Sequence, residues 1–141
     1  MAKKKTKTSI TKKACQQIQQ YARLAETDLN GYGACVSCGK VLHYSDGNGG
    51  HYQPKGANYN AASVDERNVH FQCVECNCTL GGNPAGYTEY MTSNYGNGIL
   101  DEIFILSKQT NTREMMQAAY DKYRALNKEL AKTKMFPIRL Y

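Results

Sequence analysis

The chain has 141 residues, a length that suits one domain with a modest core and two or three flanking helices. It contains no run of about 18 apolar residues, which argues against a membrane span, and its basic N-terminus lacks the apolar stretch of a signal peptide. We therefore expect a cytoplasmic protein. In that reducing setting, six cysteines favour metal binding over disulfides.

The net charge of +6 is unevenly distributed along the chain. Residues 1–30 carry seven Lys/Arg against two acids, and residues 107–141 carry eight against three, so each end has a charge of +5. Residues 31–106 carry three against seven, a charge of −4. Two basic segments around an acidic middle favour a polyanionic partner such as nucleic acid, although lysines kept for solubility explain the same pattern.

Apolar residues at helical spacing predict an N-terminal helix from Thr11 to Leu29 after a basic, disordered arm over residues 1–10. Its buried stripe includes Ala14 and Ile18, and "NGYG" at 30–33 ends it. Cys15 lies beside the stripe, where we expect it to act as a small hydrophobic residue.

Three further helices are predicted in the C-terminal half of the chain. "YTEYMTS" and "GILDEIFILS" form two short helices separated by "NYGNG". Asn111 as N-cap and Glu114 as its capping-box partner begin the last one, over residues 112–131. Its apolar stripe either packs in the core or forms a dimer seam, and the tail "MFPIRLY" packs back on the domain. The stripe consists of Met116, Tyr120, Tyr123, Leu126 and Leu130.

Two Cys-x-x-Cys pairs, "CVSC" and "CVEC", are separated by 34 residues. Four thiolates from two such turns are the ligands of a tetrahedral structural zinc site, here Cys35, Cys38, Cys73 and Cys76. Redox motifs are the alternative, but no βαβ pattern surrounds either pair. Such a closed site holds a fold together and leaves no coordination position for chemistry, so any active site must lie elsewhere.

The insert between the two pairs contains a histidine in a glycine-rich stretch, "GNGGHYQPKG". His51 alone would be an ordinary turn residue. It is followed by Asn68 and by Asn77, which comes directly after the second pair of cysteines. This order resembles that of the His-Me finger, or HNH, nucleases that carry a zinc ribbon. The segments "CVSCG", "GGHY", "NVHFQCVECN" and "LGGN" are similar to the phage recombination protein family NinG (Rap), over residues 34–101.

The resemblance implies an α+β fold with a small, zinc-stabilised ββα-metal core flanked by N- and C-terminal helices. The nuclease domain would cover residues 11–106, and residues 107–141 would form a basic helix and tail. His51 would be the general base, Asn68 would hold its orientation, and Asn77 would bind a catalytic Mg²⁺ or Mn²⁺. Neutral imidazole suits the first role because its usual pKa is near 6.5. We expect the glycines at 47, 49 and 50 to let a DNA backbone approach His51.

One position departs from the family pattern. Many HNH nucleases place an aspartate immediately before the catalytic histidine as the second metal ligand, whereas this chain has Gly50. His70 is our preferred replacement, because on a strand it would point to the same side as Asn68. A structural hydrogen bond is the alternative for it, and Asp46 and Asn83 are further candidates for the ligand. His43, in a strand-like run, is expected to be structural.

The resemblance implies a structure-specific endonuclease that hydrolyses branched DNA such as Holliday junctions during phage recombination, in the cytoplasm of the host. Because resolving a junction takes two cuts, a homodimer is expected. A zinc-ribbon DNA-binding protein without catalysis and a less selective HNH nickase are the alternatives. Candidate DNA contacts are Lys3, Lys4, Lys5, Lys12, Lys13, Lys55 and Tyr52. Tyr52 would stack on a base or sugar, or else pack beneath the strand.

Overall fold

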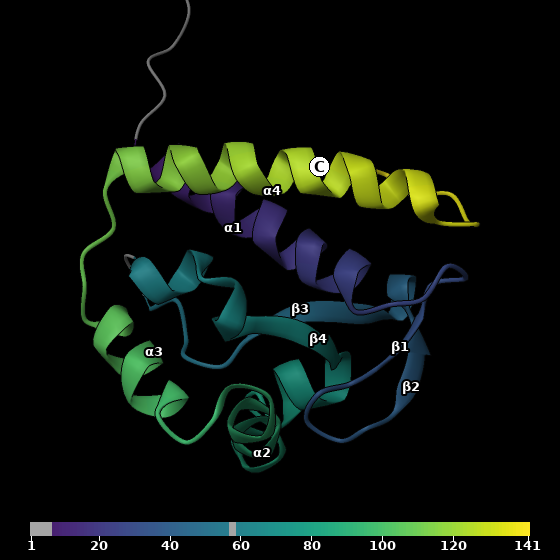
Figure 1. Ribbon diagram of the computed structural model, residues 1–141, viewed down its shortest axis with the longest axis horizontal. Helices are drawn as coiled ribbons and strands as arrows, with labels where there is room; N and C mark the ends of the chain where they lie inside the picture. Colours follow the sequence, from purple (N-terminus) through teal and green to yellow (C-terminus); the bar gives the residue numbers. More distant parts are fainter. Residues whose placement is uncertain (1–6, 57–58) are drawn as a thin grey trace, which may run out of the picture.

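Helices and short strands are stacked in layers (Figure 1). Helix α4 (Arg113–Thr133) lies on α1 (Lys7–Ala25), and α1 in turn lies on an antiparallel strand pair, β3 (Gly47–His51) and β4 (Val69–Cys73). The two-stranded sheet is therefore covered on one side by two layers of helix, first α1 and then α4.

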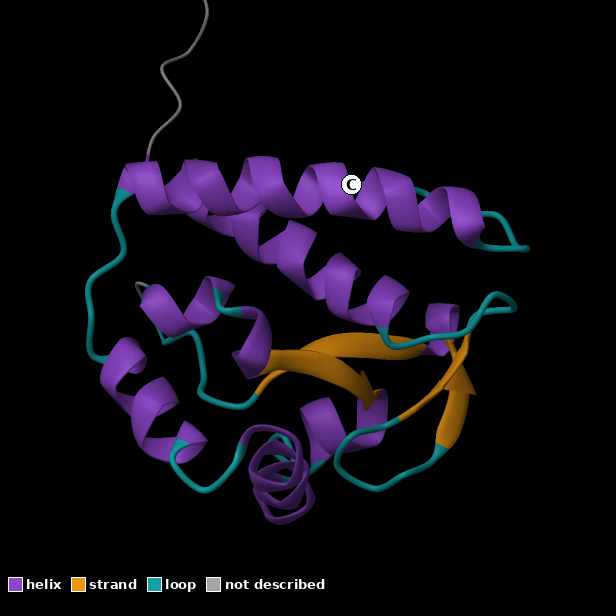
Figure 2. Cartoon of the chain, in the orientation of Figure 1, coloured by secondary structure: helices purple, strands orange, loops and turns teal. Residues whose placement is uncertain are grey.

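Two shorter helices, α2 (Pro84–Tyr95) and α3 (Ile99–Ser107), lie on the other side of the strand pair (Figures 1 and 2). This computed structural model describes residues 7–56 and 59–141. The expected α+β class is confirmed, as are the two short helices of the C-terminal half. Among the described residues, no helix has the length and apolar character that crossing a membrane requires.

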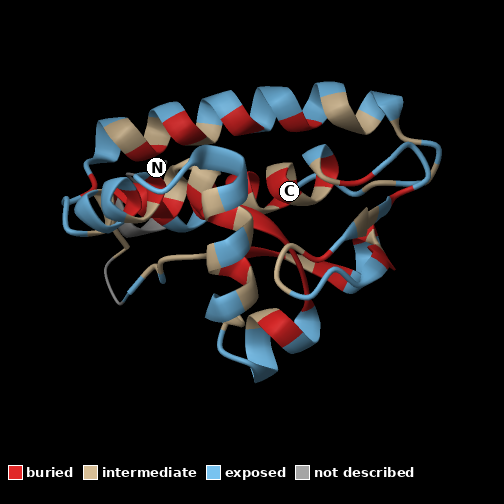
Figure 3. Cartoon of the chain, turned by 60° about the horizontal axis from the view of Figure 1, so that its bottom comes forward, coloured by how far each residue is buried: buried red, intermediate tan, exposed pale blue. Residues whose placement is uncertain are grey.

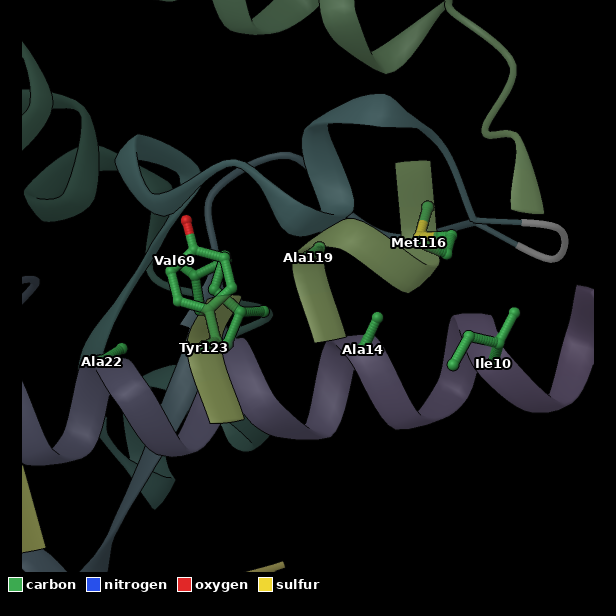
Figure 4. Packing of buried hydrophobic residues seen from close by; sticks show 8 residues of the cluster. Ile10, Ala14, Ala22, Val69, Met116, Ala119 and Tyr123 are labelled. Atoms are coloured by element: carbon green, nitrogen blue, oxygen red, sulfur yellow. The ribbon is translucent and has the colours of Figure 1, made fainter. Parts of the chain in front are cut away.

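The largest buried cluster joins α1 to α4 (Figure 4). Side chains four residues apart on α1 face the inner side of α4, while the outer side of α4 is exposed (Figure 3). Alanines at several of these positions let the two helices approach closely. The cluster contains Ile10, Ala14, Ile18, Ala22, Val69, Met116, Ala119 and Tyr123.

Helix α1 begins at Lys7 and ends at Ala25, earlier at both ends than the predicted Thr11 and Leu29. The hydroxyl of Thr27 donates to the carbonyl of Arg23 at 2.7 Å, and Asp28 then forms a turn that the apolar spacing did not reveal. Leu29 is 53% exposed and belongs to no buried stripe. Residues 1–6 of the predicted arm lie outside the described residues.

Met116 and Tyr123 of the predicted α4 stripe are buried in the α1–α4 cluster, as the core-packing alternative expected, and the homodimer stays a prediction. The register of this stripe also differs from the prediction. Leu126 is 37% exposed, whereas Asn127 is buried and its Nδ2 donates to the carbonyl of Gln17 at 2.9 Å. The N-cap is Thr112, whose hydroxyl accepts from the Met115 amide, and not Asn111.

The C-terminal tail packs back on α1, as predicted. Gln17 Nε2 donates to the Tyr141 carbonyl at 3.1 Å, and Gln20 Nε2 donates to the Arg139 carbonyl at 2.9 Å. The ring of Phe136 packs edge-on against His43. Residues 107–141 are therefore continuous with the core, joined to it through both α4 and the tail.

The strand pair sets the frame for the candidate site. In the β3–β4 register Gly50 lies opposite His70, and His51 lies opposite Val69. The chain before β4 forms two short 3-10 turns, η2 (Ala61–Val64) and η3 (Glu66–Asn68). A second strand pair, β1 (Tyr32–Ala34) and β2 (Val41–His43), flanks the first cysteine turn, and a single π-helical turn, η4 (Glu75–Thr79), follows β4.

Candidate active site and metal centre

The four paired cysteines meet between the β1–β2 turn and the end of β4. Their sulfur atoms all lie within 4.8 Å of one another, and Cys38 Sγ is 3.8 Å from Cys73 Sγ. A tetrahedral zinc ion with bonds of about 2.3 Å places its sulfur ligands about 3.8 Å apart. Cys35, Cys38, Cys73 and Cys76 can therefore bind a metal ion such as zinc, as the spacing predicted.

The surroundings of these sulfurs favour a bound cation. Burial opposes ionisation of Cys35, but nearby backbone N–H groups outweigh it and lower its pKa to about 7. Burial raises the pKa of Cys76 to about 12, so a bound cation would favour the thiolate of this residue. Asn83 Nδ2 donates to Cys76 Sγ at 3.4 Å. Asn83 thus belongs to the cysteine cluster and not to a catalytic metal site, contrary to one of our candidate assignments.

The two remaining cysteines lie outside the cluster. Cys15 is buried in α1, and burial raises its pKa to about 12, which confirms its part as a small, unreactive hydrophobic residue. Cys78 is exposed in η4.

His51 is the last residue of β3, and its ring is held from one side. The Nε2 atom lies 2.9 Å from the carbonyl oxygen of Ser63 in η2. Because a carbonyl can only accept, Nε2 carries the proton and the neutral ring keeps its lone pair on Nδ1. Burial disfavours the imidazolium ion and, with the positive charge of Lys55, lowers the pKa of His51 to about 4, against the opposing effect of Ser63. His51 is therefore unprotonated at neutral pH.

Asn68 is fully buried at the entrance to β4. Its Nδ2 donates to the carbonyls of Gln53 and Ala62, at 3.1 and 2.9 Å, and its Oδ1 accepts from the Gln53 amide at 2.8 Å. Its own carbonyl accepts from the amide of Tyr52. One side chain thus joins the loop after His51 to the turn η2, which carries the Ser63 carbonyl that accepts from the imidazole.

Asn77 lies in the π-helical turn η4, a rare form of helix that is frequent at functional sites. It lines a hollow of about 280 Å³ together with His51 and Lys55, and Gln19 of α1 and Gly49 of β3 lie in the same wall. The structure therefore brings together the three predicted residues, with Asn68 behind His51 and Asn77 beside it. Lys55 contributes a positive charge.

A second hollow of about 390 Å³ adjoins the first and shares Gln19, Gly49 and Asn77 with it. Its other walls include Gln16 and Arg23, which lie on the same face of α1 as Gln19. Among the residues that the structure describes, no acidic side chain lines either hollow. The two hollows form one groove, and the charged side chains in its walls, Arg23 and Lys55, are basic.

The glycines beside His51 are required by packing within the protein, which corrects our expectation that they make room for DNA. A Cβ atom built on Gly49 would lie 2.5 Å from the carbonyl oxygen of Gln19, so glycine lets α1 lie against β3. A Cβ atom on Gly50 would overlap the side-chain oxygen of Gln72.

His70 does not reach the groove, which corrects our preferred assignment of the second metal ligand. Its Nδ1 lies 3.0 Å from Glu26 Oε2, and its Nε2 lies 3.0 Å from the Arg67 carbonyl and 3.2 Å from the hydroxyl of Tyr95. Our prediction assumed strand alternation from Asn68, but Asn68 lies in a 3-10 turn, where that alternation does not hold. His70 has the structural role that we named as its alternative.

Two further candidates, the metal ligand Asp46 and the DNA contact Tyr52, do not lie in the groove. Asp46 is exposed and lines a different hollow, beside Cys73 and Val74. The ring of Tyr52 packs against Tyr87, with ring centroids 5.2 Å apart, and its hydroxyl bonds to Thr88 Oγ1, so it is not free to stack on DNA.

Among the predicted DNA contacts, Lys12 and Lys13 are exposed on α1, and Lys12 precedes Gln16 on the face that borders the groove. Lys3, Lys4 and Lys5 lie outside the described residues. His43 is structural, as expected, with Nε2 3.1 Å from the Asn30 carbonyl.

Sequence reasoning did not assign the polar face of α1 or the side chain of Gln72 to the candidate site. Gln16, Gln19 and Arg23 could have been found, because their spacing places them on one face of a helix whose opposite face is apolar. Gln72 could not, because its place beside Gly50 depends on the strand register.

Comparison with known proteins places the chain in a family. The model of the family described as Bacteriophage Lambda NinG protein matches residues 1–133. Over 92 residues, or 65% of this chain, the chain is 35% identical to protein ninG of Escherichia phage 933W, of Salmonella phage P22 and of Escherichia phage lambda. The match covers 43%, 42% and 42% of these relatives, so the chain spans less than half of their length. No solved structure matches the chain. The chain belongs to the NinG family of phage proteins.

Proposed function

We propose that this chain is a metal-dependent endonuclease of the HNH type that cuts branched DNA, such as Holliday junctions, during phage recombination. One observation carries the proposal. His51 donates Nε2–H to Ser63, keeps its Nδ1 lone pair, and lines the same hollow as Asn77 and Lys55. A neutral imidazole next to an oxygen ligand and a cation is the set that phosphodiester hydrolysis requires.

In this reaction a water oxygen forms a bond to phosphorus, and the proton of that water passes to Nδ1 of His51. The bond from phosphorus to the 3′-oxygen breaks, and the departing oxygen takes up a proton. A divalent ion held by Asn77 would polarise the phosphate and stabilise the departing oxygen. Lys55, in the wall of the hollow, supplies further positive charge beside a phosphate.

Asn68 acts in this proposal as a positioning residue. It makes no contact with the hollow, but its hydrogen bonds connect both chain segments that determine where His51 lies. The imidazole then needs no reorganisation when a phosphate enters.

The groove supports a nucleic-acid substrate. Two adjoining hollows, whose described lining residues include no acid, run beside α1 from Arg23 toward Lys55 in the loop after β3. Lys12 lies on the same face of α1 as Gln16. Amide side chains such as Gln16 and Gln19 can donate to phosphate and sugar oxygens without reading sequence. This fits a substrate recognised by its shape.

The substrate class is tested with a synthetic four-way junction, its constituent duplex and its single strands, each incubated with zinc-loaded protein and either Mg²⁺, Mn²⁺ or no divalent ion. We expect cutting of the junction only with added ion. Equal cutting of all three forms would indicate the less selective nickase. No cutting of any form would contradict a nuclease and favour the DNA-binding protein without catalysis, a reading that Gly50 supports because it removes the usual carboxylate.

The role of His51 is tested by His51→Ala, which should abolish cutting while junction binding is retained. His43→Ala is the matched control, because it removes a structural histidine away from the groove and should leave cutting intact. Zinc content and circular dichroism of both variants should equal those of the wild type. Wild-type cutting by His51→Ala would refute the assignment of the base.

A further inference from the structure

The side-chain amide of Gln72 has a fixed orientation. Its Nε2 donates to Ser37 Oγ at 2.7 Å and to the carbonyl of Gly82 at 2.8 Å, so both protons of the nitrogen are used. Its Oε1 is buried, and it has no hydrogen-bond partner among the described residues. An unpaired buried acceptor is unfavourable, and a native structure that holds one in place calls for a missing partner.

This oxygen points to the place where a side chain of residue 50 would begin. A Cβ atom built on Gly50 would overlap Gln72 Oε1 and would lie 2.9 Å from Asn77 Oδ1. Two amide oxygens, from β4 and from the turn η4, therefore converge on the same side of Gly50. In many HNH nucleases an aspartate occupies this position and reaches a metal ion.

We infer that Gln72 Oε1 is the second protein ligand of the divalent cation that Asn77 binds, in place of the absent carboxylate at position 50. The inference rests on the proposed function. Mg²⁺ and Mn²⁺ accept amide oxygens as ligands, and two neutral amides leave most of the coordination shell to water and phosphate. The cation is thus the partner that the buried oxygen lacks.

The same geometry links the cysteine cluster to the cation. Ser37 lies between Cys35 and Cys38 in the first cysteine turn, and Gly82 follows the second pair. Both groups that hold the Gln72 amide are therefore positioned by the zinc-binding turns, which act as a support for the ligand.

The inference is tested by Mn²⁺ binding to zinc-loaded protein, measured by electron paramagnetic resonance of the free ion. Gln72→Ala should weaken Mn²⁺ binding at least about tenfold. Gln117→Ala is the matched control, because it removes a glutamine amide on α4, away from the groove, and should bind Mn²⁺ as the wild type does. Zinc content of one ion per chain confirms that each variant is folded at the cysteine turns.

A swap variant makes the test specific to the position. Gly50→Asp alone should not fold normally or bind well, because its Cβ overlaps Gln72 Oε1. With Gln72→Ala in the same chain, that space is free, and the new carboxylate should restore Mn²⁺ binding to the wild-type level or above it. Recovery in the double variant would show that the Gln72→Ala protein still folds around the cation site and lacks only an oxygen ligand there.

The outcomes separate this inference from the proposed function. If Gln72→Ala binds Mn²⁺ as the wild type does, Oε1 is paired with an ordered water and the ligand assignment is overturned, while metal-dependent cutting by the wild type can still stand. If the wild type binds no Mn²⁺ even at millimolar concentration, the assignment is also overturned. Weakened binding by Gln72→Ala with recovery in the double variant supports it, whether or not the wild type cuts DNA.

Discussion

Replacing Asn68 with alanine removes the side chain that joins the loop after His51 to the turn carrying Ser63. The variant loses three hydrogen bonds, to the carbonyls of Gln53 and Ala62 and from the amide of Gln53. Asn68 is 0% exposed, so water does not readily replace these partners. The backbone groups of the loop and of η2 are left unpaired.

The expected loss of stability follows from these contacts. Each hydrogen bond contributes about 1 kcal/mol net, and a buried group left without a partner adds to the loss, so we expect the free energy of unfolding to fall by about 3–4 kcal/mol. Activity should fall further than stability explains. Under conditions where the variant is fully folded, His51 is no longer held between its two supports, and kcat should drop by at least about 100-fold.

Urea denaturation of zinc-loaded protein measures the free energy, and the junction assay measures kcat. Asn94→Ala is the matched control, since Asn94 is exposed on α2 and its Nδ2 makes one hydrogen bond, to the Tyr90 carbonyl. It should change stability by less than about 0.5 kcal/mol. If Asn68→Ala destabilises by less than about 1 kcal/mol, or folds fully and cuts at the wild-type rate, Asn68 does not position His51.

Two further predictions concern protons and zinc. Because the pKa of His51 is lowered from 6.5 to about 4, kcat/KM should stay level from pH 8 down to about 5, and a decline centred near 6.5 would contradict the buried, unprotonated base. The unfolded chain takes up a proton on His51 below pH 6.5, whereas the folded chain does so only below about pH 4. The contribution of His51 to the free energy of unfolding is therefore complete above pH 6.5 and is lost as the pH falls from 6.5 to about 4. Unfolding titrations, with the zinc content checked at each pH, should show this loss. Removing zinc from the cysteine cluster should lower the Tm by at least about 10 °C, measured by circular dichroism, and an unchanged Tm would mean that no ion stabilises the fold.

The parts of the fold that the sequence predicted are those determined by local spacing. The two cysteine pairs meet because each pair is a tight turn, and α2 and α3 form where glycines at 96 and 98 divide two helical patterns. The predicted helix ends were wrong where a polar side chain determines the first or last residue of the helix. Thr27 and Asp28 end α1 before its last apolar residue, and Thr112 competes successfully with its neighbour Asn111 for the N-cap of α4.

The candidate site was predicted less completely, for a similar reason. His51, Asn68 and Asn77 were assigned through the resemblance to HNH nucleases, whereas the ligand role of His70 was inferred from an alternation that a 3-10 turn interrupts. Gln72 looks like an ordinary strand residue in the sequence. The strand register places Gln72 diagonally across from Gly50, and two hydrogen bonds fix its side-chain nitrogen. Only these two features determine where its Oε1 atom points.

The inferred metal site, built from amides, would suit a groove that accepts DNA. Asn77 and Gln72 bring oxygen atoms without negative charge, whereas an aspartate at position 50 would add a carboxylate that repels the phosphate. Without a carboxylate, the proposed site would bind a free cation weakly, and the phosphate itself would supply the missing anionic ligand. Affinity for the cation and affinity for DNA then rise together, since coupling between two ligands acts equally in both directions. In this proposal an ion would be held firmly only when a phosphate is present, which would restrict the proposed chemistry of His51 to a groove that already contains DNA.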